Sequence, residues 1–205
     1  MKHFKKNLIF ACLASLLVVF SNCNKPDWDE PEISKGIINA TNVIGASNNF
    51  VTVKALSYSL GHGSLVSIAS AEFKNGGFTM TLPSPVPDRL FFSYTPFGFD
   101  HYIYDFISDM NARWGVISYF MAYDNDGDEV AEIFCCCEED DYGAIVCYMY
   151  ADRNFTIEGE TREYVYNCTL KKGWNTLYLI WSNSSDYEIV TTQKPMGKSF
   201  KWYAY

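Results

Sequence analysis

The sequence predicts an all-β protein, most simply an antiparallel β-sandwich, and three observations lead to this prediction. Aromatic residues make up 17% of the 205 residues, and tyrosines and phenylalanines alternate with other residues in short runs, as they do in strands. No segment shows sustained helical periodicity. Short candidate strands recur with polar turns between them, which is typical of a sandwich or, as the second choice, of a closed barrel.

The first half of the predicted domain, 36–90, is expected to be a meander of short strands. Asn75-Gly76-Gly77 lies between two alternating runs, and glycine-containing turns in that position are strong hairpin signals. Pro83, Pro85 and Pro87 then prevent ladder pairing, because proline has no backbone N–H to donate. The expected strands are 50–59, 65–73 and 78–82.

A longer aromatic connection, roughly 91–114, separates this part from a second half in the same style. The length suits one domain, 36–205, or two small halves, 36–90 and 115–205, that share a boundary. The strands expected in the second half are 115–123, 129–137, 144–150, 154–158, 164–170, 176–181 and 200–205.

The N-terminus predicts a bacterial lipoprotein signal peptide, 1–22. Three lysines among the first six residues precede an apolar run, 8–20, and the run stops shortly before Cys23. That apolar run is shorter than the roughly 20 residues that a membrane-spanning helix needs. We therefore expect cleavage before Cys23 and lipidation of its thiol, so that the lipid bilayer is a partner through acyl chains.

An acidic segment with two prolines follows, 23–35, and is expected to be a tether because it has little to bury. Acidic residues directly after the lipidated cysteine resemble the export signal of surface lipoproteins in Bacteroides-type bacteria. This resemblance implies an outer-membrane location with the domain facing the cell exterior. A domain facing the periplasm is the alternative.

The charge balance excludes some partners. The whole chain has a formal charge of −8, and removal of 1–22 takes away three lysines and no acids, which leaves 13 basic and 24 acidic residues and a charge of −11. Nucleic acids and anionic lipid surfaces require a positive protein surface. We therefore expect no nucleic-acid partner.

Five cysteines remain after the signal peptide and Cys23 are set aside: Cys135, Cys136, Cys137, Cys147 and Cys168. An odd number leaves at least one thiol outside any intramolecular disulfide. If the turn between two neighbouring strands centres on Asp141, Cys135 and Cys147 lie opposite each other and can form a cross-strand disulfide. A register change of one residue removes this bridge.

Acidic residues at alternate positions in one predicted turn suggest a second candidate site. Asp124, Asp126 and Asp128 surround Gly127, and hard oxygen ligands spaced in this way can bind calcium weakly at a surface. The glycine stands before the third acid, which departs from the EF-hand pattern. A plain turn built from Asp, Asn and Gly is the main alternative, and we expect no other cofactor.

Aromatic residues in the irregular connection form the candidate ligand site. Tyr102, Tyr104 and Phe106 stand there with Asp100, His101 and Asp105, so aromatic faces adjoin hydrogen-bond acceptors. Such a pairing suits a glycan or protein ligand. The alternative is a loop packed over one end of the sandwich.

Several segments resemble those of small uncharacterised Bacteroides-type lipoproteins, over nearly the whole mature chain. They include 52–56, 69–83, 107–112, 151–157, 170–175 and 201–203. The first half also resembles a transthyretin-type or carboxypeptidase-regulatory-type β-sandwich, through the run that ends in Asn75-Gly76-Gly77-Phe78. Neither resemblance implies a catalytic residue.

These observations predict a non-enzymatic surface lipoprotein whose domain binds or displays something. An adhesin or assembly component is the first alternative, and a small glycan-active enzyme is the second. For the enzyme, two carboxylates would have to face each other across a cleft. The available acids include Glu72, Glu132, Asp152, Glu158 and Glu160.

Overall fold

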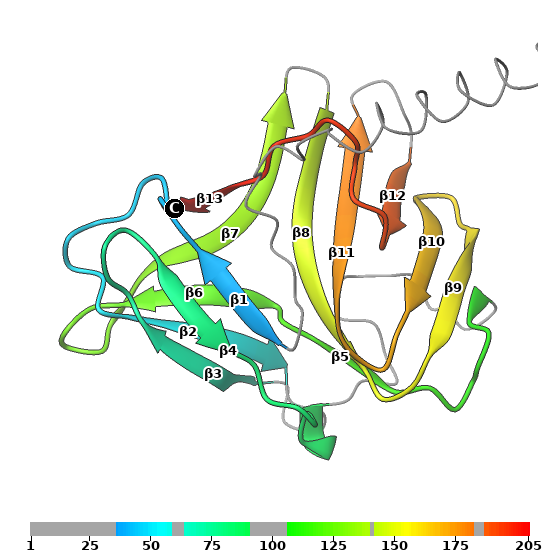
Figure 1. The fold of residues 1–205 in the computed structure, drawn as a ribbon, viewed down its shortest axis with the longest axis horizontal. Coiled ribbons are helices and arrows are strands. Elements are labelled where there is room, and N and C mark those ends of the chain that lie inside the picture. Colours follow the sequence, from blue (N-terminus) through cyan, green and yellow to red (C-terminus); the bar gives the residue numbers. More distant parts are fainter. Residues whose placement is uncertain (1–35, 59–63, 91–105, 140–141, 183–186) are drawn as a thin grey trace, which may run out of the picture. The chain divides into compact units, whose positions relative to one another are not determined.

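The fold of this chain is built from strands. The computed structural model describes residues 36–58, 64–90, 106–139, 142–182 and 187–205, and these ranges contain thirteen strands, one 3-10 turn and no α-helix. The predicted all-β class is therefore confirmed (Figure 1). In the first half the elements are β1 (Ile37–Ala40), β2 (Thr52–Tyr58), β3 (Leu65–Glu72), β4 (Phe78–Thr81) and η2 (Asp88–Leu90).

The second half supplies nine more strands. They are β5 (Trp114–Val116), β6 (Tyr119–Tyr123), β7 (Glu129–Glu139), β8 (Tyr142–Ala151), β9 (Phe155–Glu160), β10 (Tyr164–Leu170), β11 (Gly173–Ser182), β12 (Glu188–Thr191) and β13 (Lys201–Ala204). The predicted signal peptide, Cys23 and the tether lie outside the described residues. Within the described ranges, no helix is long and apolar enough to cross a membrane.

One predicted strand, 115–123, is divided in two. The backbone N–H of Ile117 donates to Tyr148 of β8, whereas the next N–H, of Ser118, donates to Leu56 of β2. Consecutive residues thus bind different strands, and β5 pairs with β8 while β6 pairs with β2 and β7. The chain crosses from one part of the sheet to another at this point.

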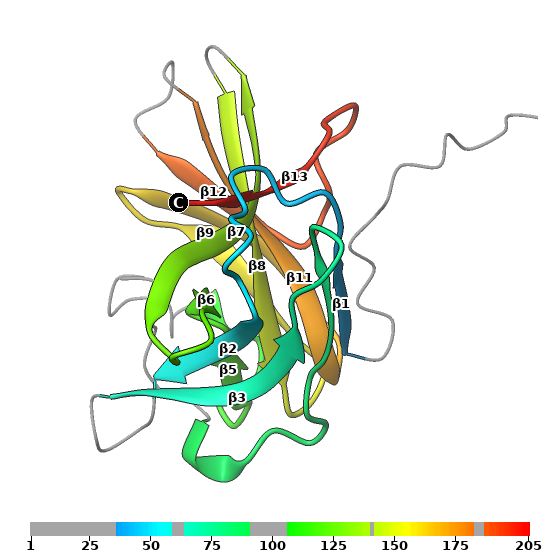
Figure 2. The ribbon, with the colours of Figure 1, turned by 90° about the vertical axis from the view of Figure 1, so that its left-hand side faces the viewer.

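The strands form a large mixed sheet and a small one. The large sheet has the order β3-β2-β6-β7-β8-β11-β12-β10-β9, and β1 and β4 form the small sheet. All neighbours are antiparallel except β10 and β12, which run parallel, and β12 lies between β11 and β10. Figure 2 shows β2 and β3 running across the direction of β8 and β11, so the large sheet has two parts that cross.

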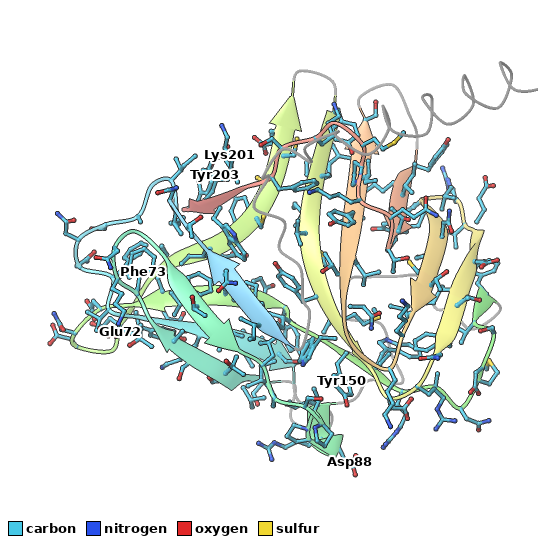
Figure 3. The ribbon with its side chains drawn as sticks, viewed as in Figure 1. Glu72, Phe73, Asp88, Tyr150, Lys201 and Tyr203 are labelled. Atoms are coloured by element: carbon cyan, nitrogen blue, oxygen red, sulfur yellow. The ribbon has the colours of Figure 1, made fainter. Side chains whose placement is uncertain are left out.

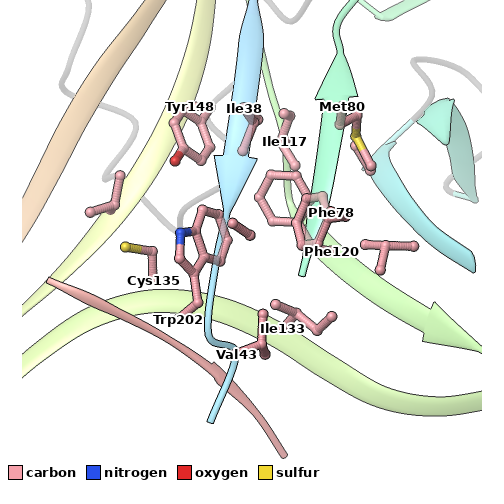
Figure 4. Close-up of a cluster of buried hydrophobic side chains, with 14 of the residues drawn as sticks. Ile38, Val43, Phe78, Met80, Ile117, Phe120, Ile133, Cys135, Tyr148 and Trp202 are labelled. Atoms are coloured by element: carbon pink, nitrogen blue, oxygen red, sulfur yellow. The ribbon is translucent and has the colours of Figure 1, made fainter. Parts of the chain in front are cut away.

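The small sheet packs on one face of the large sheet, which gives the sandwich-like arrangement. Ile38 of β1 and Met80 of β4 share a buried cluster with Phe120, Tyr148 and Trp202 of the large sheet (Figure 4). The rings of Phe120 and Trp202 lie edge to face, with centroids 5.8 Å apart, an arrangement that aromatic pairs favour. Because this cluster draws on both 36–90 and 115–205, the two predicted halves share one core.

The opposite face of β8 and β11 is also buried. Met149 and Leu177 point into a second cluster with side chains of β5, β9, β10 and β12. The segment from Phe106 to β5 spans the open side of this curled region, because Ile107 forms a bridge with Ile157 of β9 and β5 pairs with β8. Both faces of β8 are thus covered, which explains why its apolar residues do not alternate strictly with polar ones.

Candidate functional site

The candidate site lies where β7 changes partners. Ile133 pairs with Phe120 of β6 and with Ala204 of β13, so β6 and β13 lie on opposite edges of β7. Cys136 pairs with Ile145 of β8 and with Lys201 of β13, so β8 also lies opposite β13. Strands β6 and β8 therefore share one edge of β7 and diverge between these two positions. We call this divergence the fork.

The third side of the fork is the crossing between β5 and β6. The ladder of β8 with β7 ends at Ile145, and its ladder with β5 begins at Met149. Between them, the carbonyl of Tyr148 accepts the N–H of Ile117 at 3.0 Å. The fork is thus a gap in the large sheet, bounded by β7, β8 and the chain that crosses between them.

A cavity of about 390 Å³ occupies the fork. Its volume falls in the range of small-molecule sites, which are mostly apolar with a few polar groups. Glu132, Ser118 and Tyr119 are among the polar residues of its lining, and Cys135 and Cys147 contribute to it from opposite faces of the sheet. The apolar walls include Ile117, Phe120, Ile133, Phe134, Val146 and Leu179.

Glu132 is the carboxylate of this cavity. Burial raises the pKa of Glu132 above its usual value, because a less hydrated site disfavours the charged form. Tyr119 lies near it. The neighbouring phenol of Tyr58 raises the pKa of Tyr119, and burial, a hydrogen bond between the two phenols and the charge of Glu132 add to the effect. A carboxyl and two phenols therefore meet in a mostly apolar environment.

A row of aromatic rings lies beside Glu132. Tyr205 and Glu132 exchange two backbone hydrogen bonds, of 2.9 and 3.0 Å. The ring of Tyr205 stacks on Phe134, with centroids 5.2 Å apart and an interplanar angle of 12°. Tyr203 extends the row, with its centroid 6.3 Å from that of Phe134, and Figure 3 places it on β13. Tyr205 is 75% exposed, so the row leads from solvent to the cavity.

Two hydroxyl groups in the cavity wall have no partner in the described structure. They are Oγ of Ser118 and the phenol oxygen of Tyr148, and both atoms are buried. The close-up shows the Tyr148 oxygen, the Trp202 indole nitrogen and the Cys135 sulfur on one side of the cluster (Figure 4). An unpaired buried polar group costs about 1–3 kcal/mol. Neither oxygen is exposed to the cavity, so this cost falls on the packing around the fork.

The predicted disulfide between Cys135 and Cys147 is not formed, and both thiols are free. The register pairs Cys136 with Ile145, which places Cys135 opposite Val146, one residue from the register that the bridge requires. The two cysteines consequently pack in different hydrophobic clusters. Burial raises the pKa of each to about 12, so both are neutral thiols at pH 7 and poor nucleophiles.

The acidic turn does not bring its side chains together as a calcium site. Oδ1 of Asp124 accepts the backbone N–H groups of Asp126 and Asp128, each at 3.0 Å, as in a turn closed by an Asp side chain. Gly127 has a φ of +86°, which the turn requires and glycine adopts without strain. In the described ranges, no three His, Cys, Asp or Glu side chains are grouped to hold a metal ion.

The predicted aromatic ligand site in the connection is only partly described. Tyr102 and Tyr104 lie outside the described residues. Phe106 is half-buried against the second cluster, and its ring stacks on Tyr166 with centroids 6.3 Å apart. The ring also lies so close to Gly159 that a Cβ there would collide with it. Phe106 therefore packs as part of the core, as in the alternative of a loop packed over the sandwich.

A polar network holds the same connection at its other end. Asp152, after β8, accepts hydrogen bonds from the backbone N–H of Arg113 at 3.0 Å and from its Nε at 3.2 Å. Arg153 also contacts Asp152 and forms an ion pair with Asp109. Burial pushes the pKa of Asp152 up, but these hydrogen bonds outweigh it and hold the pKa below its usual value.

Sequence reasoning named Glu132 only as one of several acids and did not identify the cavity. The missed signal was in 133–137, where apolar residues occupy consecutive positions instead of alternate ones. A strand of that kind is covered on both faces. A second signal was the aromatic pair Tyr203, in the last strand, and Tyr205, directly after it.

Comparison with known proteins identifies no relative. No family model matches the chain, and no match was found among curated proteins or solved structures. The resemblance to Bacteroides-type lipoproteins and to transthyretin-type sandwiches stays a prediction. Functional inference rests on the geometry of the fork.

Proposed function

We propose that this chain is a lipid-anchored surface lipoprotein whose β-domain binds a ligand in the fork cavity without catalysing a reaction. The observation that carries this proposal is the cavity itself, about 390 Å³ and lined mainly by apolar side chains. The cavity opens to solvent beside Tyr205, and ligand sites are commonly concave spaces of this size with mostly apolar walls. A space of this size with a few polar groups in its wall is therefore better explained by a ligand than by packing.

The polar groups support binding over catalysis. Among the described residues that line the cavity, Glu132 is the only carboxylate. Glycoside hydrolysis uses a pair of carboxylates. Nucleophilic catalysis through Cys135 or Cys147 needs a thiolate, and both thiols are neutral at pH 7. A glycan or a protein segment is a ligand of the expected class, because stacked rings and hydrogen-bonding groups lie together there.

The membrane anchor is tested by replacing the predicted lipidation site. Cys23→Ala should leave the precursor uncleaved or release the domain from the membrane fraction, because the acyl chains provide the attachment. Fractionation after a carbonate wash measures this release, and retention of the variant in membranes would contradict the anchor. Proteinase treatment of intact cells tests surface exposure, and protection of the domain would place it in the periplasm.

Ligand binding is tested by filling the cavity. The full chain in non-ionic detergent should bind the neutral dye Nile red saturably, since the cavity offers an apolar lining. Cys147→Trp places an indole in the cavity wall and should weaken binding at least tenfold. The matched control is Asn167→Trp on β10, at an exposed position, which should leave binding unchanged.

A second cavity-filling variant keeps the experiment decisive if Cys147→Trp fails to fold. Ile145→Phe adds less volume to the same wall and should weaken binding less than Cys147→Trp, with thermal midpoints reported for every variant. Dye affinity that is the same in wild type and both filled variants would place the bound dye elsewhere. Absence of saturable binding to the wild-type chain would count against the proposed binding function and favour display or assembly.

A further inference from the structure

We infer that the ligand of the fork cavity carries an organic cation, an ammonium group attached to an apolar body. This inference rests on the proposed function, because it names the class of ligand for the same cavity. Three properties of the fork point to it: a carboxylate without a cationic partner, aromatic residues on the strand of that carboxylate and on both neighbouring strands, and the negative charge of the protein.

The carboxylate of Glu132 lacks a partner of opposite charge within the described ranges. The ion pairs there involve Glu72, Asp88, Asp109 and Asp152, and none involves Glu132. The titratable groups near Glu132 include the phenols of Tyr119 and Tyr205 and, through Tyr119, that of Tyr58. Lys194 is close enough to lower the pKa of the Cys135 thiol, but burial alone shifts the pKa of Glu132. A half-buried carboxylate in this position gains more from a bound cation than a fully hydrated one would.

Aromatic residues lie on the strand of Glu132 and on both neighbouring strands. Phe134 follows two residues later on the same face of β7, and Tyr205 pairs with Glu132 through the backbone. Tyr119 approaches from β6, close enough for the charge of Glu132 to act on its phenol. Rings of this kind attract ammonium groups through their electron-rich faces, and quaternary ammonium ligands are commonly bound between several aromatic rings.

Overall charge favours the same ligand class. The chain has a formal charge of −8, so its field attracts cations and repels anions. The apolar walls contributed by Ile117, Phe120 and Leu179 would hold an uncharged body. A ligand with an ammonium group at the Glu132 end and an apolar remainder satisfies both parts of the cavity.

The test compares two probes of the same shape that differ in charge. They are 3-(trimethylammonio)phenol and its neutral isostere 3-tert-butylphenol, titrated by calorimetry into the full chain in non-ionic detergent with a detergent blank. We expect the cation to bind at least about tenfold more tightly, as several ring contacts and a carboxylate together would give. Equal affinities, or tighter binding of the neutral probe, would overturn the inference.

Variants assign the preference to named groups. Glu132→Gln should remove most of the preference for the cation while leaving binding of the neutral probe unchanged. Glu138→Gln, on the same strand at an exposed position, is the matched control and should keep it. Tyr119→Phe retains the ring and should keep the preference, whereas Tyr119→Leu should reduce it severalfold. A preference that survives Glu132→Gln in full would overturn the assignment to the fork.

The outcomes separate this inference from the proposed function. If both probes bind equally and Cys147→Trp weakens both, the cavity binds ligands but does not select cations, and only the inference fails. If neither phenol binds while Nile red binds saturably, the inference again fails alone. If no probe of the three binds, the proposed binding function fails with it.

Discussion

The two half-buried carboxyl groups of Asp152 and Glu132 have opposite environments. Asp152 is surrounded by donors from Arg113 and Arg153, and these hold its pKa below the usual value. Glu132 has no such donors in the described structure, and burial raises its pKa. Proteins normally satisfy the polar groups they bury. The contrast therefore distinguishes a group that maintains the fold from one that, in the proposed function, is available to a ligand.

The positions of the two groups agree with this difference. Asp152 ties the segment that closes the second cluster to the end of β8, and its side chain is 12% exposed. Glu132 lies at the fork, where the large sheet opens and two wall hydroxyls, of Ser118 and Tyr148, are also unpaired. Polar groups are thus paired at one end of β8 and unpaired near the middle of the same strand.

The largest expected effect on stability comes from removing the hydrogen-bonded carboxylate of Asp152. Asp152→Ala removes four hydrogen bonds. A hydrogen bond to a charged group contributes about 1.5–3 kcal/mol to the free energy of unfolding. Because the arginines can turn to solvent, we expect a net loss of about 2–3 kcal/mol in the free energy of unfolding, measured with urea. Asp126→Ala, in an exposed turn, is the control and should change stability by less than about 0.5 kcal/mol. A loss that small for Asp152→Ala would show that its network is not structural.

A smaller effect is expected at Glu132, and its dependence on pH has the opposite sign. The folded pKa of Glu132 lies above its ordinary value of 4.5, so the folded state binds more protons between these two values. Stability should therefore rise as the pH falls through the folded pKa toward 4.5. For Asp152 the folded pKa lies below 3.8, and stability should be lost as the pH falls from 3.8 through that pKa.

Urea unfolding at a series of pH values separates the two contributions. Glu132→Gln should remove the rise on the acidic side and leave stability at pH 7 equal or higher by less than about 1 kcal/mol. Asp152→Asn should flatten the loss below pH 3.8. A Glu132→Gln variant that is less stable than wild type at pH 7 would indicate a structural partner for this carboxylate.

Most strands could be predicted from local pattern. The expected strand 65–73 corresponds to β3 and 164–170 to β10, because alternation and turn residues are properties of short segments. The four-residue strands β1 and β12 were missed, whereas β4 and β13, of the same length, were predicted because β4 follows a glycine turn and β13 is rich in aromatic residues. The parallel pairing of β12 with β10 is a long-range contact that no turn residue specifies.

The fork could not be predicted, because it depends on which strands share an edge of β7. The triple cysteine and its neighbours indicated a strand, but the choice between β6 and β8 is made by tertiary packing. Likewise, the register that separates Cys135 from Cys147 differs by one residue from the expected one. A turn longer or shorter by one residue shifts every pair, and local sequence determines this weakly.

Segments whose sequences resemble those of lipoproteins contribute polar contacts that stabilise turns. Asp109 belongs to one stretch and Asp152 and Arg153 to another, and the structure joins them in a single network with Arg113, which directly follows the first stretch. Asn154 and Lys172 connect two further turns through a hydrogen bond of 2.7 Å. These residues hold turns in place, which accounts for their polar character at the end of a sheet.

The bend of β7 has a mechanical consequence. One unbroken backbone lies beside β6 over its first half and beside β8 over its second, so it belongs to both crossing parts of the large sheet (Figure 1). Strands resist stretching far more than they resist twisting. A molecule bound in the fork would push β6 away from β8. Because β7 pairs with both strands, it would convert this separation into a rotation of one crossing part of the large sheet against the other.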